Sequence, residues 1–152
     1  MSVSKDFEEL FALLNAHGVK ALIVGGHAVA FHAKPRYTKD IDVFVEPSEG
    51  NAARLLLALS DFGFGQLGLS AEDFTTLGNV VQLGYPRNRV GLLTAVTGLS
   101  FEEAWSSRTP GRYGAQSVQY IGREALIRNK RSAGRPQDLA DVAMLEAAAS
   151  VP

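Results

Sequence analysis

The sequence predicts an α/β fold, in which helices pack around a small mixed sheet of four or five strands. Short apolar runs alternate along the chain with longer segments whose apolar residues recur at helical spacing. The first apolar run leads directly into a pair of glycines, a pattern typical of a strand that is followed by a helix. A chain of 152 residues, 46% of them hydrophobic and 20% charged, is globular and can bury one core. We therefore expect a single domain over residues 1–152.

The first half of the chain is predicted to alternate helices with strands. Ser4 is a suitable N-cap for the first helix, and Gly18 suits the left-handed position that ends it. Pro35 ends the short helix after the glycine pair, and Ser48 can cap the next helix. In order, we expect a helix at residues 4–16, a strand at 21–24, a short helix at 26–33, a second strand at 41–45 and a helix after Ser48.

The second half is predicted to contain a hairpin, a capped helix and two C-terminal helices. Two short strands joined by a turn at Pro86 predict the hairpin. Ser100 and Glu103 form a capping box, and Phe101 and Trp105 lie four apart as an apolar pair. We expect strands at residues 79–83, 89–93 and 117–121, the last at an edge of the sheet, a turn-rich connection at 109–114, and helices at 125–130 and 137–148.

Two carboxylates, Asp40 and Asp42, stand at the start of the second predicted strand. Residues two apart on a strand project to the same face, so the two carboxylates repel and each raises the pKa of the other. A divalent cation removes this cost, and hard oxygen ligands suit Mg²⁺. At the Gly25–Gly26 turn, backbone N–H groups unshielded by a Cβ can hold a phosphate. The combination predicts a site for a nucleoside triphosphate, at the ends of the first two strands.

These groups together resemble a known superfamily. The motif reads Gly25-Gly26, then Arg36-x-Thr38-x-Asp40-Ile41-Asp42. It resembles the nucleotidyltransferases of the polymerase-β type and, more narrowly, small bacterial nucleotidyltransferase-like proteins related to the AbiEii/AbiGii abortive-infection toxins. The resemblance extends over residues 10–145. It implies transfer of a nucleoside monophosphate from a triphosphate to a hydroxyl, with Asp40 and Asp42 holding Mg²⁺. The acceptor is RNA, a protein side chain or a small molecule.

Three residues in or near this motif have two alternative roles each. Arg36 either pairs with the triphosphate, as the resemblance implies, or forms a salt bridge with Asp40 or Glu46 that fixes the loop. Thr38 either hydrogen-bonds a carboxylate or caps the start of the strand. His27, at the mouth of the glycine turn, either contacts a ligand or is an ordinary polar residue at a helix start.

The C-terminal third contains a second motif, Lys-x-x-x-Gly-Arg-x-x-Asp-x-x-Asp, that begins at Lys130 and ends at Asp141. It also resembles the nucleotidyltransferase-like toxins, whose late Lys and Asp belong to the active site. The resemblance implies that Lys130 contacts the triphosphate and that Arg135 assists it or pairs with Asp138. From the residues alone, the alternative is a cluster of cations at the end of one helix and acids at the start of the next, an arrangement that helix dipoles favour.

Gly91 departs from the family pattern. Related proteins read Arg-Ile/Val-Asp-Leu-Leu on a later strand, and this chain reads Arg89-Val90-Gly91-Leu92-Leu93. In the family pattern, the aspartate of this strand is the third carboxylate of the active site, and Gly91 stands in its place. No Asp or Glu occurs between Asp73 and Glu102, so no neighbour in the sequence replaces it. Loss of a base or of metal activation costs about 10²–10⁴-fold in rate. The alternative function is therefore a degenerate nucleotide- or protein-binding module, as half of a toxin–antitoxin pair with an antitoxin partner.

Composition excludes several classes of protein. A net charge of −1 argues against a protein that coats nucleic acid with a generally basic surface. The absence of cysteine excludes disulfides and thiolate chemistry and permits a cytoplasmic setting. The charged N-terminal sequence lacks the apolar core of a signal peptide, and no apolar run approaches the roughly 18 residues of a membrane span. We therefore expect no membrane partner.

Overall fold

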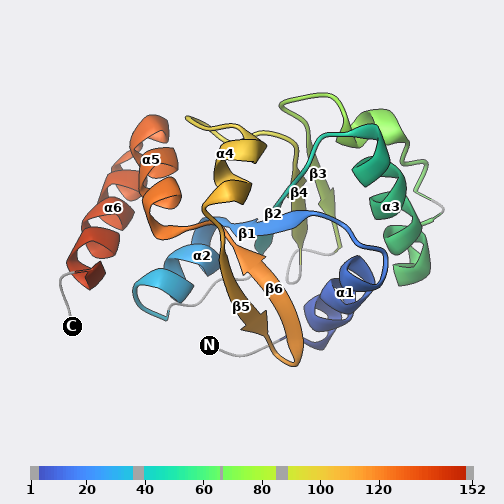
Figure 1. The fold of residues 1–152 in the computed structure, drawn as a ribbon, viewed down its shortest axis with the longest axis horizontal. Helices are drawn as coiled ribbons and strands as arrows, with labels where there is room; N and C mark the ends of the chain where they lie inside the picture. The colour runs from blue at the N-terminus through green and yellow to red at the C-terminus, as the bar shows by residue number, and fades with distance from the viewer. Residues whose placement is uncertain (1–3, 36–39, 66, 85–88, 150–152) are drawn as a thin grey trace.

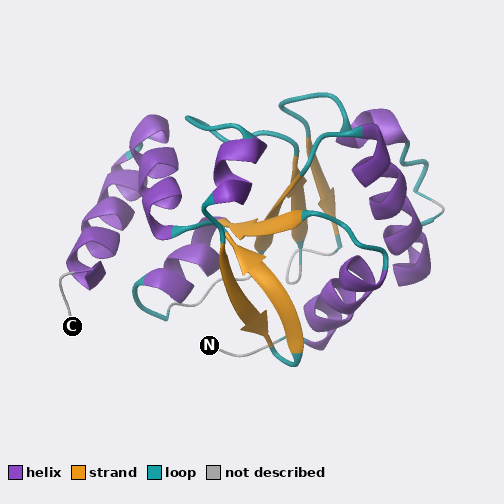
Figure 2. Cartoon of the chain, in the orientation of Figure 1, coloured by secondary structure: helices purple, strands orange, loops and turns teal. Residues whose placement is uncertain are grey.

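The computed structural model describes residues 4–35, 40–65, 67–84 and 89–149, and its centre is a six-stranded mixed sheet flanked by helices (Figures 1 and 2). The strand order is β3-β4-β2-β1-β6-β5. The strands are β1 (Ala21–Val24), β2 (Ile41–Val45), β3 (Val80–Leu83), β4 (Val90–Leu93), β5 (Thr109–Tyr113) and β6 (Gln116–Tyr120). The predicted α/β class is confirmed, but the predicted number of four or five strands is wrong.

Six helices surround the sheet in the described part of the chain. They are α1 (Lys5–Ala16), α2 (Gly25–His32), α3 (Glu49–Leu59), α4 (Phe101–Ser106), α5 (Arg123–Ala133) and α6 (Pro136–Ala149), with a π-helical turn at Ser60–Phe64 and a 3₁₀ turn at Ala71–Phe74. At one end of the molecule α5 packs against α6, and at the other α1 packs against α3 (Figure 1). None of the helices in the described residues has the length and hydropathy that a membrane span requires.

The sixth strand is β5, in the segment for which the sequence predicted only a turn-rich connection. It pairs antiparallel with β6, from Thr109 opposite Tyr120 to Tyr113 opposite Gln116. Pro110 cannot donate a backbone hydrogen bond, but an edge strand tolerates proline because one side of the strand has no partner. The edge position predicted for the last strand is also wrong, since β6 lies between β1 and β5.

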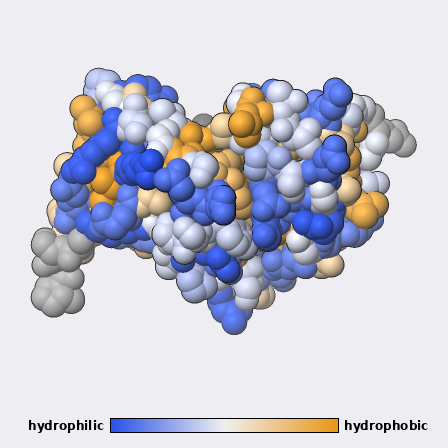
Figure 3. All heavy atoms as spheres, turned by 45° about the horizontal axis from the view of Figure 1, so that its top comes forward, coloured by the Kyte–Doolittle hydropathy of each residue, from blue (hydrophilic) through white to orange (hydrophobic). Residues whose placement is uncertain are grey.

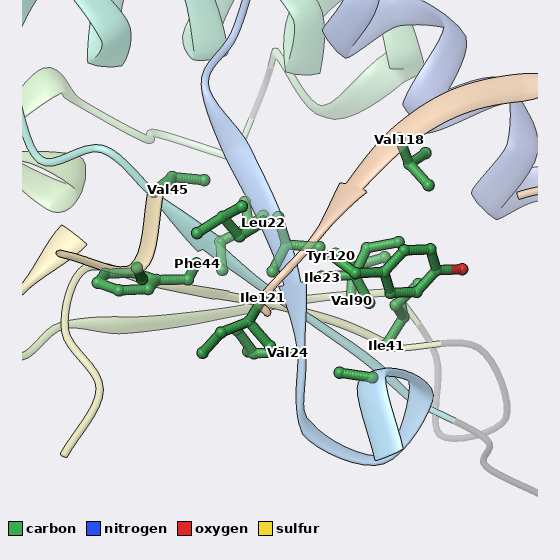
Figure 4. Close-up of a cluster of buried hydrophobic side chains, with 14 of the residues drawn as sticks. Leu22, Ile23, Val24, Ile41, Phe44, Val45, Val90, Val118, Tyr120 and Ile121 are labelled. Atoms are coloured by element: carbon green, nitrogen blue, oxygen red, sulfur yellow. The ribbon is translucent and has the colours of Figure 1, made fainter. Parts of the chain in front are cut away.

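The centre of the sheet is buried on both faces. On β2, Ile41, Val43 and Val45 share one face and are fully buried. On the other face, Phe44 packs edge-on against Phe101 of α4, with ring centroids 5.0 Å apart. Figure 4 shows Ile41, Phe44 and Val45 among buried side chains of the neighbouring strands. Asp42 is therefore a polar side chain on an otherwise apolar central strand.

The first helix forms as its sequence predicts. The Ser4 hydroxyl accepts a hydrogen bond from the backbone N–H of Phe7, which satisfies one of the free donors of the first turn. Gly18 adopts the left-handed conformation, with φ of 66°, just after the helix ends. The apolar stripe faces the core through Phe7, Leu10, Phe11 and Leu14. The Ser48 cap of α3 and the Ser100–Glu103 capping box of α4 are confirmed in the same way.

His27 is buried in the first turn of α2, and neither of its ring nitrogens has a hydrogen-bond partner among the described residues. It packs beside the ring of Tyr113, at 6.2 Å between centroids. Burial lowers the pKa of His27 below 6.5. The unfolded chain therefore takes up a proton at a higher pH than the folded chain, and stability falls as the pH drops below 6.5.

We expect the variant His27→Phe to retain more of its stability between pH 7 and pH 5 than the wild-type protein, because a phenyl ring fills the same site without a group to protonate. Denaturant unfolding at the two pH values measures the difference. An equal loss of stability in both proteins would contradict this assignment.

Candidate active site

A pocket of about 650 Å³ opens where β1 ends and β2 begins, beside α5 and α6. The two strands are antiparallel, so the site lies at the end of one strand and the start of the other, rather than at the ends of both as predicted. The pocket is lined by Val24, Gly25, Gly26, Asp42, Leu93, Ala95, Val96, Thr97, Asn129, Lys130, Ala133, Arg135, Gln137 and Asp138. It thus brings together six residues that the sequence singled out: Gly25, Gly26, Asp42, Lys130, Arg135 and Asp138.

The Asp42 carboxylate lies between two glycines on neighbouring elements. In the sheet, Asp42 is opposite Val24 on β1 and opposite Gly91 on the parallel strand β4. A Cβ at Gly91 would come within 2.7 Å of Asp42 Oδ1, and a Cβ at Gly25 within 2.7 Å of Oδ2. Gly25 also has φ of +67°, which favours glycine on conformational grounds. Both glycines therefore leave the space that the carboxylate occupies.

The start of α2 forms the second wall of the pocket. Its N-cap is Val24, and no side chain in the described part of the chain caps the first turn. The first N–H groups of a helix have no partner within the helix, and they carry the positive end of the helix dipole. Since Gly25 and Gly26 line the pocket, these donors are placed to bind an anion such as a phosphate.

The electrostatics of Asp42 favour a bound cation. Burial raises the pKa of Asp42, the neighbouring charge of Asp40 raises it further, and the positive charge of Lys130 opposes the shift. Asp40 is exposed just before β2. The described residues contain no group of three or more His, Cys, Asp and Glu side chains that could hold a metal. Two carboxylate oxygen donors fit a Mg²⁺ ion that takes its other ligands from water and phosphate.

Lys130 is held by two buried acids of α6. Its Nζ lies 3.1 Å from Asp141 Oδ2 and 3.5 Å from Asp138 Oδ1. Asp138 also accepts hydrogen bonds from Arg135, at 2.7 Å from Nε and 3.2 Å from the backbone N–H. These bonds from Arg135, together with the charge of Lys130, lower the pKa of Asp138 to about 2 despite its burial. Of the two predicted roles of Arg135, pairing with Asp138 is the one observed.

The remaining predicted site residues are not among the described residues that line the pocket. Arg36 and Thr38 lie outside the described residues. His27 does not line the pocket and packs against Tyr113 instead. Sequence reasoning missed Asn129, whose Nδ2 donates to the carbonyl of Thr97 at 2.9 Å. The only signal for Asn129 was its position beside Lys130, and neutral side chains of this kind form no recognisable motif.

Residues 3–149 match a protein family described as "Nucleotidyl transferase of unknown function (DUF2204)". The chain belongs to this family. The nucleotidyltransferase identity suggested by the glycine and aspartate motifs is therefore confirmed at the level of the family. The narrower relation to the abortive-infection toxins is not shown by this match. No curated protein matches the chain.

Solved structures support the same fold for this DUF2204 protein. The lincomycin-bound crystal structure of the lincosamide antibiotic adenylyltransferase LnuA is similar with a TM-score of 0.60 and 13% identity, over 97% of this chain and 99% of that one. An antigenic nucleotidyltransferase-like protein from Paracoccidioides brasiliensis is similar with a TM-score of 0.54 and 18% identity, over 96% and 77% of the two chains. At these identities the similarity shows the fold alone.

Proposed function

We propose that this DUF2204 protein transfers a nucleoside monophosphate from a nucleoside triphosphate to a hydroxyl acceptor. One observation carries the proposal: a single pocket contains the start of α2, the half-buried carboxylate of Asp42 and the ammonium of Lys130. Anion donors, a metal-binding carboxylate and a cation are the groups that a triphosphate with its metal requires.

Each group has a role in this proposal. Asp40 and Asp42 would hold Mg²⁺, which when bound neutralises phosphate charge. The first N–H groups of α2 bind phosphate oxygens, and Lys130 adds a positive charge to the same pocket. Arg135 keeps its side chain 76% exposed while it holds Asp138, so its free guanidinium N–H groups can reach the triphosphate at the pocket rim.

The reaction forms one bond and breaks one. The acceptor oxygen attacks the α-phosphorus, the bond from that phosphorus to the bridging oxygen breaks, and pyrophosphate leaves with the bonding electrons. The hydroxyl proton passes to a carboxylate of the Asp40–Asp42 pair or to water.

A small molecule is the acceptor class that we favour. The similar fold of LnuA, whose structure was solved with lincomycin bound, supports an acceptor of this size. The net charge of −1 gives the chain no general attraction for RNA. RNA and protein acceptors remain the alternatives.

A second candidate function is favoured by Gly91. It lies directly beside Asp42, where the family pattern places the third carboxylate. The other carboxylate that lines the pocket, Asp138, is already bonded to Arg135 and Lys130. The chain would then bind nucleotide without transferring it, as a module that acts through a partner such as an antitoxin. An aspartate at position 91 would displace Asp42, so Gly91→Asp restores activity only if Asp42 turns aside.

Transfer is tested with each of the four nucleoside triphosphates labelled at the α-phosphate, in Mg²⁺, with lincomycin and simple alcohols as acceptors. Labelled acceptor together with released pyrophosphate supports the enzyme. Metal-dependent binding without either product supports the second candidate. Failure of every triphosphate to bind would overturn both.

Gly25→Ala is expected to weaken metal-dependent triphosphate binding about tenfold or more, which corresponds to about 1.4 kcal/mol. The new methyl group would push the Asp42 carboxylate out of its place. A matched control is Gly68→Ala, since Gly68 also has a positive φ, of +71°, but nothing within 4 Å of a Cβ. Both variants carry a backbone strain of about 1 kcal/mol. Equal nucleotide affinity in the two variants, measured by calorimetry, would contradict the role of Gly25.

A further inference from the structure

A second pocket, of about 640 Å³, lies next to the first and has a different character. Its lining includes Trp105 of α4, which is partly exposed, and the buried side chains of Phe44, Leu99 and Phe101 behind it. The Phe101 and Trp105 rings stack at 5.6 Å between centroids, and Leu77 stands at the rim with 70% of its surface exposed. The size is that of a site for a small organic molecule. Figure 3 shows such apolar surface (orange) among hydrophilic residues on one face of the molecule.

The two pockets are neighbours that share one lining residue. Ala95, in the segment after β4, lines both of them. Along β2, Asp42 lines the first pocket, and Phe44 and Glu46 line the second. Residues two apart on a strand lie on one face and about 7 Å apart, so this face of β2 leads from the carboxylate into the apolar pocket. A molecule seated against Trp105 in the second pocket can therefore extend a group along this side of the sheet toward Asp42.

The charges of the second pocket select against a phosphate backbone. Glu46 accepts hydrogen bonds from Lys20 and Ser48, and Glu102 adds a second carboxylate. Of the described residues that line this pocket, Lys20 is the only cation, and Glu46 pairs with it. Nucleic acid would meet carboxylates where it needs cations. The aromatic wall instead favours an uncharged ring body.

We propose that this pocket holds the hydroxyl-bearing acceptor, a small molecule with an apolar ring body whose hydroxyl points along β2 toward Asp42. The inference rests on the proposed function, because it assigns the second substrate of that reaction. Each pocket then binds one substrate: charged groups bind the triphosphate in the first pocket, and aromatic groups bind the acceptor in the second.

Trp105 is the single tryptophan of the chain and lines the second pocket, so its fluorescence can report binding there. We would titrate 2-phenylethanol, cyclohexanol and lincomycin while following Trp105 emission, and measure ATP binding in Mg²⁺ separately by calorimetry. We expect at least one probe to shift the emission saturably, with or without ATP. Leu77→Asp should weaken that probe about tenfold or more, because it places a charge on an exposed apolar rim without disturbing the core. A matched control is Leu67→Asp, at a leucine that is 57% exposed and lines neither of the two pockets.

The outcomes separate the two proposals. No emission change with any probe, or a change that Leu77→Asp leaves intact, would overturn the acceptor pocket. Competition between probe and ATP, or loss of ATP affinity in Leu77→Asp, would also overturn it, because the pocket would then hold the nucleotide base. Absence of ATP binding in the wild-type protein, with probe binding retained, would instead contradict the proposed function.

Discussion

Asp42→Asn is expected to lower metal-dependent triphosphate affinity at least about 100-fold and any transfer rate by about 10²–10⁴-fold, since it removes a metal-binding charge from the pocket. Asparagine has the same shape, so the fold should persist. The folded state holds the Asp42 proton to a higher pH than the unfolded chain, so wild-type stability falls as the pH rises above 3.8 through the folded pKa. The variant lacks this penalty at neutral pH and should be at least as stable as the wild type.

Calorimetric titration and denaturant unfolding of the same preparations measure the two effects. Asp61→Asn is the control, because Asp61 is a half-exposed carboxylate that pairs with His17 and lines neither pocket. It should leave binding unchanged. Undiminished ATP affinity in Asp42→Asn would rule out Asp42 as a metal ligand, and lost binding accompanied by lost stability would point to a structural role.

Lys130→Met is expected to destabilise the protein by about 3 kcal/mol, because it leaves two buried acids without their shared cation. Only 12% of the Lys130 side chain is exposed, and Asp141 and Asp138 are buried. Thermal unfolding should show a decrease in Tm of about 10 °C. Arg131→Met is the matched control on the same helix, since its pair with Glu146 is half-exposed and contributes at most about 1 kcal/mol.

A double variant separates the structural role of Lys130 from phosphate binding. Lys130→Met with Asp141→Asn removes a cation and an acid together, so part of the lost stability should return. Triphosphate affinity should stay low if Lys130 contacts phosphate. Recovery of both stability and affinity would mean that Lys130 only neutralises the acids of α6.

Local structure was predictable because local chemistry determines it. The bounds of β1 and β2 match the apolar runs, and Ser4, Ser48 and Ser100 cap their helices as expected. The late Lys-Asp-Asp spacing predicted a charged cluster, and the structure brings Lys130 to both acids. The strand bounds and caps depend on neighbours within a few residues along the chain, and the charged cluster depends on the short connection between α5 and α6.

Features that depend on strand order were not predictable. β5 contains Pro110 and Gly111, which indicate a turn unless the strand is known to lie at an edge. The family resemblance identified Gly91 as a departure from the family pattern. Only the parallel pairing of β2 with β4 shows that Gly91 adjoins Asp42. The apolar pocket combines residues from five separate segments, and no periodicity links them.

Isothermal titration with ATP, GTP, CTP and UTP, each with and without Mg²⁺, tests the central claim most directly. The structure predicts that at least one triphosphate binds only with the metal, through the pocket between α2, β2 and α5, and that Asp42→Asn abolishes this binding. Failure of all four to bind, in the presence of Mg²⁺ and with the protein folded, would contradict the nucleotide site and leave a nucleotidyltransferase fold retained for another purpose.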